Sequence, residues 1–120
     1  MTIEAALFTT LSALVAGRVY PDAAPLGTVM PFICYEQAGG DALAFLDGTL
    51  PNKKHGRFEI GVYAKDRVAC SSLALAVEAT LTGAPAELFT ARAIVAPMSD
   101  HNPETGVYSS VQPYSIFSDR

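Results

Sequence analysis

The residues best suited to chemistry lie in the segment SDHNPE, where Asp100 precedes His101 and Glu104 follows three positions later. An imidazole and two carboxylates are side chains that bind divalent metal ions in proteins. Their spacing matches no specific ligand pattern, and a turn rich in Asp, Asn and Pro also satisfies its own backbone groups. The sequence therefore favours an ordinary hairpin turn and leaves a small metal-dependent hydrolase as the alternative.

A cysteine nucleophile is the second kind of chemistry to consider. Cys34 and Cys70 lie far apart and form no CxxC pattern, so both are expected to be buried, reduced thiols. Cys70 lies in the segment ACSS within a predicted helix, where a core position is favoured over a catalytic one. Because a cysteine and a histidine can meet in space without being neighbours in the chain, a cysteine-based enzyme stays open as an alternative.

Two further kinds of catalytic site find no support. The segment AGGDA lacks the lysine and the spacing of a phosphate-binding loop, and the chain has no GxSxG motif. Asp41 and Asp47 lie in a polar loop with no sign of the burial that perturbs catalytic carboxylates. We therefore predict no catalytic residue, no cofactor and no metal ion, and expect that the chain is not an enzyme. A ligand-binding module is a further alternative.

Composition and charge argue against direct binding of nucleic acid. The chain has 120 residues, of which 50% are hydrophobic and 17% charged, with a formal net charge of −4. This length predicts a single domain, residues 1–120, and the low share of charged residues favours self-association. The basic residues cluster only at Lys53, Lys54 and His55, with Arg57 beyond them. A protein that gains its affinity from phosphate groups needs a larger basic face.

The N-terminal segment MTIEAALFTTLSALVAG resembles a signal peptide only superficially. It lacks a positively charged start, and Glu4 stands where a lysine or arginine is expected. No segment approaches the roughly 20 apolar residues that cross a membrane. We therefore expect a soluble, cytoplasmic protein that does not act at a membrane.

Hydrophobic periodicity predicts two helices and four strands. Apolar residues recur at helical spacing over 3–16 and 67–82, and strict alternation over 57–65 is typical of a half-buried antiparallel strand. Further strands are predicted at residues 31–38, 93–98 and 107–117. The order is αββαββ. The simplest two-layer arrangement is an α+β fold, with two helices packed on one face of a mainly antiparallel four-stranded sheet.

Capping residues support both helices. Thr2 and Asp66 are suited to accept hydrogen bonds from the first turns, and Gly17 and Gly83 are suited to end the helices. In the second helix we expect Ala69, Leu73, Ala76, Val77 and Leu81 to face the core.

The connections between these elements are unusual. Three prolines, Pro21, Pro25 and Pro31, stiffen the connector at residues 17–31. The loop at residues 38–56 is long for a compact domain, contains an apolar patch around its middle, and is expected to be functional or mobile. Pro113 in the last strand indicates an edge or a bulge.

Three segments together resemble a known family. They are AGRVYPDAAPLGTVMPFICYE, GRFEIGVYAKD and DHNPETGVYSSVQPYSIF, which follow one another from the first helix to Phe117. Their order and spacing is similar to that of the tail-completion or head–tail joining (tail terminator-like) proteins of long-tailed phages and prophages. No single one of these motifs is specific by itself.

This resemblance implies a structural protein of virion assembly. Members of that family complete or terminate the tail, join it to the head connector and act as rings, commonly hexameric. The implied partners are further copies of the chain, the tail tube and the head connector, and the implied location is the host cytoplasm during assembly and then the virion. An acidic ring would also let DNA pass without binding it.

The resemblance also leads to a hypothesis about interface residues. The polar loop and the polar turn are expected to meet a neighbouring subunit, the tube or the connector. The residues concerned are Lys53, Lys54, His55, Asp100, His101 and Glu104.

Overall fold

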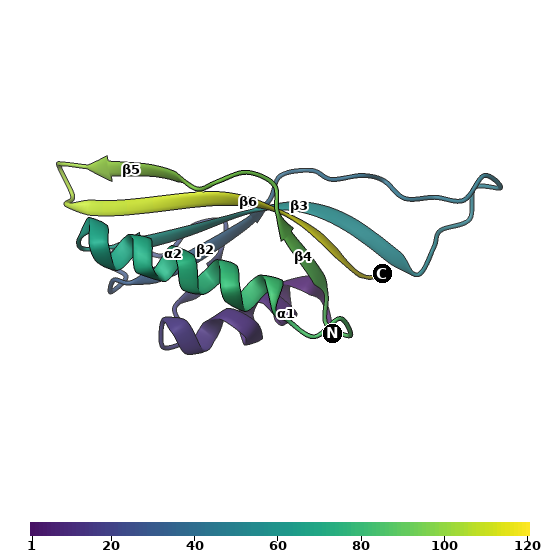
Figure 1. Cartoon of the computed structure of the whole chain (residues 1–120), viewed down its shortest axis with the longest axis horizontal. Helices are drawn as coiled ribbons and strands as arrows, with labels where there is room; N and C mark the ends of the chain where they lie inside the picture. Colours follow the sequence, from purple (N-terminus) through teal and green to yellow (C-terminus); the bar gives the residue numbers. More distant parts are fainter.

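The computed structural model describes all of residues 1–120 as a layer of helices packed on a six-stranded mixed sheet (Figure 1). The elements in chain order are α1 (Ile3–Leu11), the 3-10 helix η1 (Ser12–Leu14), β1 (Val19–Pro21), β2 (Phe32–Gln37), β3 (Lys53–Ala64), α2 (Arg67–Thr82), β4 (Thr90–Ala93), β5 (Met98–Asn102) and β6 (Val107–Asp119). Across the sheet the order is β1-β2-β3-β6-β4, and β5 pairs with the first half of β6. β1 and β2 are parallel, whereas all other neighbours are antiparallel.

The α+β class and the packing of both helices on one face agree with the sequence prediction, but the four-stranded sheet does not. The connector contains β1, a strand of three residues that pairs in parallel with β2. A run this short, ending in Pro21, has no alternation that identifies it in the sequence. The predicted order αββαββ is therefore wrong, because an additional strand precedes β2.

The predicted strand at residues 93–98 is also wrong. The strands are β4 and β5, and the intervening residues 94–97 lie opposite only residues 112–113 of β6. Such a mismatch is a bulge. Pro113 lies at this point, and its carbonyl accepts a hydrogen bond from the Ile94 N–H at 2.9 Å. Although β6 is an interior strand, it tolerates the proline because the missing N–H faces the bulged segment.

Both helices begin as their capping residues predict. Thr2 Oγ1 accepts the N–H of Ala5 at 3.2 Å, and Asp66 Oδ1 accepts the N–H of Ala69 at 2.7 Å. The first helix is shorter than predicted, because the chain tightens into η1 before Gly17 takes a positive φ of 82°. These local signals fix where α1 and α2 start.

One hydrophobic core fills the space between the helices and the sheet. It contains 19 buried residues, from both helices, from β1 to β4, from β6 and from the connecting segments. The predicted alternation holds in β3, where the even-numbered residues from Phe58 to Ala64 all join the core. On α2, Val77 and Leu81 are buried and Leu73 packs against the core, as predicted. Ala69 is exposed instead, and the fully buried residue of the first turn is Cys70.

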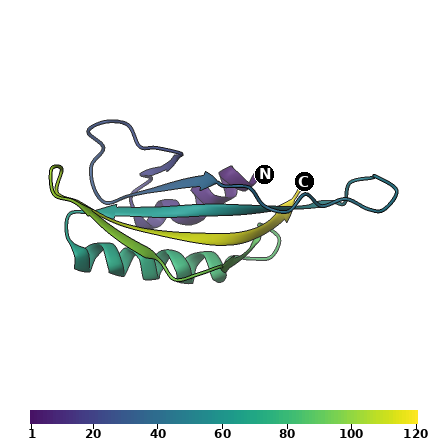
Figure 2. The ribbon, with the colours of Figure 1, turned by 90° about the horizontal axis from the view of Figure 1, so that it is seen from above.

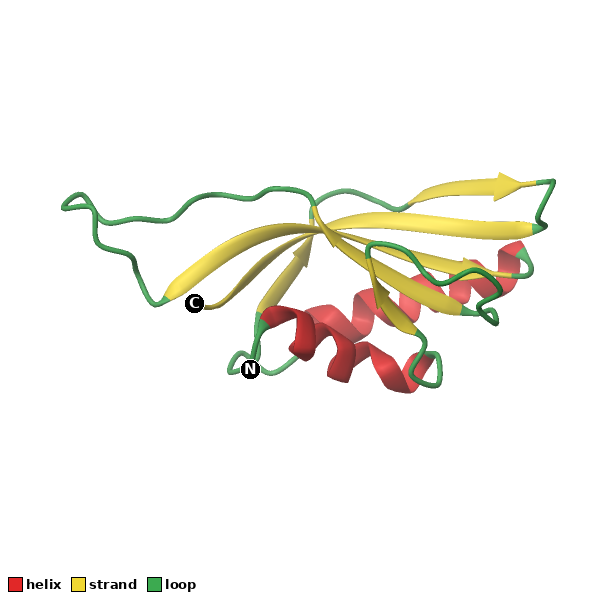
Figure 3. Cartoon of the chain, turned by 180° about the vertical axis from the view of Figure 1, so that it is seen from behind, coloured by secondary structure: helices red, strands yellow, loops and turns green.

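The molecule is elongated, with extents of 53 × 25 × 23 Å. The connection between β2 and β3 projects from one end, and the turn between β5 and β6 lies at the other (Figures 1 and 2). Seen from behind, both helices again lie on the same side of the sheet (Figure 3). Neither helix is long and apolar enough to cross a membrane.

Candidate functional site

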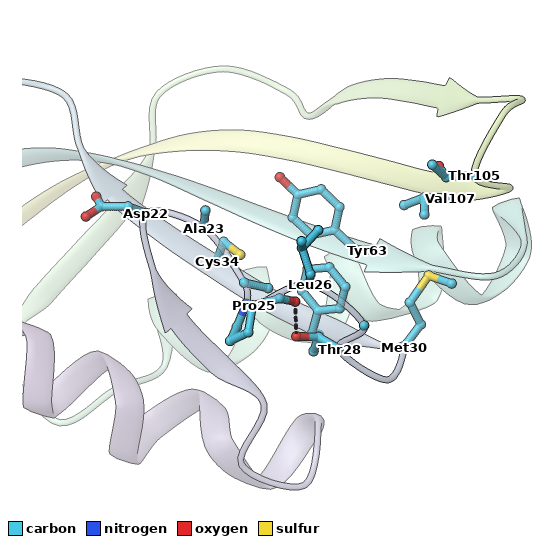
Figure 4. Close-up of a pocket in the computed structure, with 13 residues that line it drawn as sticks. Asp22, Ala23, Pro25, Leu26, Thr28, Met30, Cys34, Tyr63, Thr105 and Val107 are labelled. Carbon is cyan, nitrogen blue, oxygen red and sulfur yellow. Dashed lines mark hydrogen bonds between the residues drawn. The ribbon is translucent and has the colours of Figure 1, made fainter.

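The face of the sheet that carries no helix forms the floor of the candidate site. Side chains alternate along a strand, so Phe32 and Cys34 of β2 and Tyr63 of β3 lie on the face opposite to the core. On its way from β1 to β2 the connector crosses this face as residues 22–31 (Figure 4). The space between this segment and the sheet is named the hollow below.

The hollow has a volume of about 420 Å³ and a mainly apolar lining. It is lined by Asp22, Ala23, Ala24, Pro25, Leu26, Gly27, Thr28, Met30, Phe32, Cys34, Tyr63, Thr105 and Val107. The ring of Phe32 stacks on that of Tyr63 with centroids 4.8 Å apart, and Tyr20 meets Phe32 edge-on at 6.4 Å. Asp22 is the only charged residue of the lining. An apolar recess of this size is suited to binding an apolar group.

Hydrogen bonds hold the connector in place over the hollow. The N–H of Asp22 donates to the carbonyl oxygen of Tyr35 at 2.8 Å and fixes its start. Arg18 Nε donates to the carbonyl oxygen of Pro31 at 2.9 Å and fixes its end. Between these points the side chain of Leu26 is fully exposed. The proline-rich segment thus builds one wall of the hollow and presents an apolar side chain on it.

Residues 38–57, named the arm below, form the second prominent surface. The arm leaves β2, projects beyond the end of the sheet and returns as the first residues of β3 (Figure 1). Near its tip the large side chains of Phe45, Leu46 and Leu50 are all exposed. The apolar patch predicted in this loop therefore lies in solvent within the single chain, which is typical of a contact surface.

The predicted interface residues Lys53, Lys54 and His55 lie at the base of the arm, in the first positions of β3. His55 Nδ1 accepts the N–H of Asp41 at 2.8 Å, and Nε2 lies 2.7 Å from Ser115 Oγ. Because a backbone N–H can only donate, Nδ1 is the acceptor and Nε2 donates to Ser115. His55 therefore joins both strands of the arm to β6.

The C-terminus anchors the arm from the same side. The N–H of Arg120 donates to the carbonyl oxygen of Asn52 at 2.7 Å, and Arg120 Nε donates to that of Pro51 at 2.9 Å. The side chain of Lys53 forms an ion pair with Asp119. The base of the arm is thus held in position, while the tip has no contact of this kind.

The second predicted group lies at the other end of the molecule. Asp100 and His101 are in β5, and Glu104 is in the turn that follows. The His101 ring stacks on Tyr108, with centroids 4.0 Å apart. No three His, Cys, Asp or Glu side chains gather into a group that could hold a metal ion. The structure therefore does not bring this group together with the basic residues of the arm.

The two cysteines lie on opposite sides of the sheet, Cys34 in β2 on the open side and Cys70 in α2 on the helical side. Cys34 lines the hollow, Cys70 belongs to the core, and both are free thiols. Burial raises the pKa of the Cys34 thiol and of the Cys70 thiol, which disfavours the nucleophilic thiolate. Cys70 Sγ donates to the carbonyl oxygen of Val62 at 3.7 Å. These environments give the cysteine-based alternative no support.

Sequence reasoning missed the hollow. Met30, Phe32 and Tyr63 fall within the predicted connector and strands at residues 17–31, 31–38 and 57–65, and none of them is among the predicted site residues. A signal was present, since the connector carries Leu26, Val29 and Met30 in a segment built for turns. The sheet face that the connector covers depends on the pairing of β1 with β2, which has no local signature.

Comparison with known proteins identifies a family and a similar fold. A family model described as "Tail completion protein gp17" matches residues 3–117. The fold is similar to that of a chain in a solved structure described as "Virion of native gene transfer agent (GTA) particle". The TM-score is 0.63 and the identity 16%, over 98% of this chain and 94% of that chain. Comparison with curated protein sequences gave no match.

Proposed function

The chain belongs to the tail completion protein gp17 family, and from this premise we propose that it completes or terminates a phage tail and joins it to the head connector. The family match carries the proposal, because it extends over residues 3–117 of 120. The fold supports it, since a chain from a gene transfer agent virion shares that fold over nearly the whole length of both chains.

The proposed partners are further copies of this chain, arranged as a ring, together with tail tube and head connector proteins. The long axis of 53 Å and the exposed apolar tip of the arm favour a protein whose surfaces are completed by neighbours. The formal net charge of −4 is suited to a ring through which DNA passes without binding. The protein would reside in the host cytoplasm during assembly and then in the virion.

The two groups of predicted interface residues are proposed to serve different contacts. Lys53, Lys54 and His55 lie at the arm base, and the hairpin of β5 and β6 carries the acidic group around His101. Because Lys53 pairs with Asp119 at one end of β6 and Asn102 pairs with Val107 at its other end, the two groups cannot form one patch within a chain. A subunit with contacts at both ends is suited to stand between neighbours.

No catalytic activity is proposed. A metal-dependent enzyme would require Asp100, His101 and Glu104 to converge, whereas His101 is engaged with Tyr108. A cysteine-based enzyme would require a thiolate, whereas burial raises the pKa of both thiols. The stacking of His101 on Tyr108 and the burial of Cys34 and Cys70 account for the positions of these residues.

The test is electron microscopy of particles from a phage or prophage that carries an in-frame deletion of this gene. Filled heads beside unattached tails are expected, and abnormally long tails would specify a terminator. The control is the same deletion with the gene supplied in trans, which should restore joined particles. Normal, infectious particles from the deletion would reject the proposed function.

A further inference from the structure

We propose that the tip of the arm of one copy inserts into the hollow of the next copy, and that this contact links neighbouring subunits. The inference rests on the proposed function, because it names the surfaces through which the proposed ring closes. It assigns a role to the exposed arm tip and to the hollow, two apolar surfaces that no other part of the same chain covers.

The arm tip has the properties of an inserting element. Phe45 and Leu50 are each 59% exposed and Leu46 is fully exposed, so these side chains have little contact with their own chain. The tip backbone is nevertheless ordered, since the N–H of Phe45 donates to the carbonyl oxygen of Thr49 at 2.8 Å. A preformed turn loses little conformational entropy when it binds.

The hollow has the properties of the receiving surface. Its floor is the stacked pair of Phe32 and Tyr63, and Leu26 and Met30 belong to its wall. The wall is fixed by a backbone hydrogen bond at its start and by the Arg18 side chain at its end, so the recess exists before anything binds in it. The floor and the wall of the hollow are apolar, so they are suited to contact the apolar side chains of the arm tip.

Charges around the two surfaces are also complementary. Beyond the hollow, Asp22, Glu36 and Glu59 line a smaller recess on the open face of the sheet, and Arg57 Nη2 lies 4.0 Å from Glu59 Oε1 at its margin. Behind its tip, the arm carries Lys54 beside Lys53, which is already paired with Asp119. When the arm inserts tip first, the positive charge at its base approaches these carboxylates of the next copy. This attraction favours one orientation of the two copies.

A second copy is the occupant that the geometry favours. The arm projects from one end of the molecule (Figure 2), whereas Thr105 and Val107, beside the β5–β6 turn at the other end, line the hollow, so the arm of a chain points away from its own hollow. When the arm of one copy occupies the hollow of another, the pair still has one free arm and one free hollow. Repetition of such a contact produces a ring when the rotation closes.

The test is disulfide cross-linking in purified particles. In a Cys34→Ser background, which removes the native thiol of the hollow, the variant Leu26→Cys/Leu46→Cys places one thiol in the hollow and one at the arm tip. After mild oxidation we expect a ladder of covalent oligomers on a denaturing gel, because each subunit is linked on both sides. The matched control pairs Leu46→Cys with Val68→Cys, an exposed position on α2, in the same Cys34→Ser background and should give no ladder.

The outcomes separate this inference from the proposed function. If the double variant is incorporated into joined particles at the wild-type level but stays monomeric on the gel, the inference is overturned and the proposed function stands. If wild-type particles do not contain the chain, the proposed function fails and the inference fails with it.

A charge substitution keeps the inference testable if the cysteine variant does not assemble. Leu46→Asp should reduce incorporation into particles at least tenfold and leave the thermal midpoint of the purified chain unchanged, since Leu46 makes no contact inside it. Leu46→Met and Val68→Asp should both incorporate normally. Normal incorporation of Leu46→Asp would overturn the inference.

Discussion

His101 and Tyr108 occupy paired positions of β5 and β6, and their rings stack with centroids 4.0 Å apart and planes 16° from parallel. Arg67 of α2 holds this stack, with its guanidinium carbon 5.3 Å from the centroid of the Tyr108 ring. Its Nη1 donates to the carbonyl oxygen of Ser109 at 3.0 Å, and its Nη2 donates to that of Asp100 at 2.7 Å. The imidazole is therefore one layer of a packed cluster that fastens the β5–β6 hairpin to the second helix.

This arrangement predicts that ring shape matters at position 101 and that imidazole chemistry does not. His101→Ala should lower the free energy of unfolding by up to about 1 kcal/mol, the usual value of a cross-strand pair. His101→Phe should retain most of it, because a planar ring can still stack on Tyr108. Urea denaturation of the purified variants measures both. A zinc-dependent rise of the thermal midpoint that both variants lose would contradict a purely structural role.

A buried polar network predicts a coupled pair of substitutions. Gln112 Nε2 donates to Glu78 Oε2 at 3.2 Å and to the carbonyl oxygen of Val95 at 3.0 Å, while its Oε1 accepts the hydroxyl of Tyr114 at 2.9 Å. Tyr114 is fully buried. Gln112→Ala leaves that hydroxyl without its acceptor, so it should cost about 1–3 kcal/mol of stability.

A double-mutant cycle tests this network. Tyr114→Phe removes the hydroxyl, so adding Gln112→Ala to it should cost less than the same substitution costs in the wild type. Chemical denaturation of the four proteins gives the coupling energy. Strictly additive effects would show that the hydrogen bond between the two side chains does not contribute to stability.

The fold could be predicted from the sequence where a local pattern decides it. Thr2 and Asp66 cap the helices because the cap geometry needs only neighbouring residues. The alternation in β3 identifies the core face because one side of the strand is packed by helices. The bulge at residues 94–97 and the strand β1 are different, since both are defined by a partner strand distant in sequence.

The candidate site could be predicted less well, for the same physical reason. The sequence marked Lys53, Lys54 and His55 as part of a polar loop, whereas pairing with β6 extends β3 through all three. It identified the connector as rigid but not as a wall, because the connector gains that role only when β1 pairs beside β2. Residues distant in sequence that share one face of a sheet have no common pattern along the chain.

The position of the arm should depend on Gly40. Its φ is +134°, and a Cβ built there would lie 2.8 Å from Gly56 Cα and from the carbonyl oxygen of His55. Because both contacts are backbone, Gly40→Ala must displace the start of the arm from β3. Hydrogen exchange of the arm amides should accelerate at least tenfold.

Gly48 provides the matched control for Gly40. It also has a positive φ, of 87°, but a Cβ there would meet nothing within 4 Å. Gly48→Ala should therefore cost only the local backbone strain, about 1 kcal/mol, and leave exchange at the base of the arm unchanged. Equal acceleration at the base in both variants would show that the close approach of Gly40 to β3 does not hold the arm.

The tip of the arm should loosen in acid through Asp47. Thr49 Oγ1 and the Thr49 N–H donate to Asp47 Oδ1 at 2.6 and 2.9 Å, and these bonds hold the pKa of Asp47 below its ordinary value of 3.8. Because the folded pKa is lowered, the stabilisation of the turn is complete above pH 3.8 and is lost as the pH falls through the folded pKa. An NMR titration should give an Asp47 midpoint below 3.8 in the wild type. In Thr49→Val, which loses the hydroxyl and keeps the N–H, the midpoint should move toward 3.8, and an unchanged midpoint would exclude the hydroxyl as the main cause.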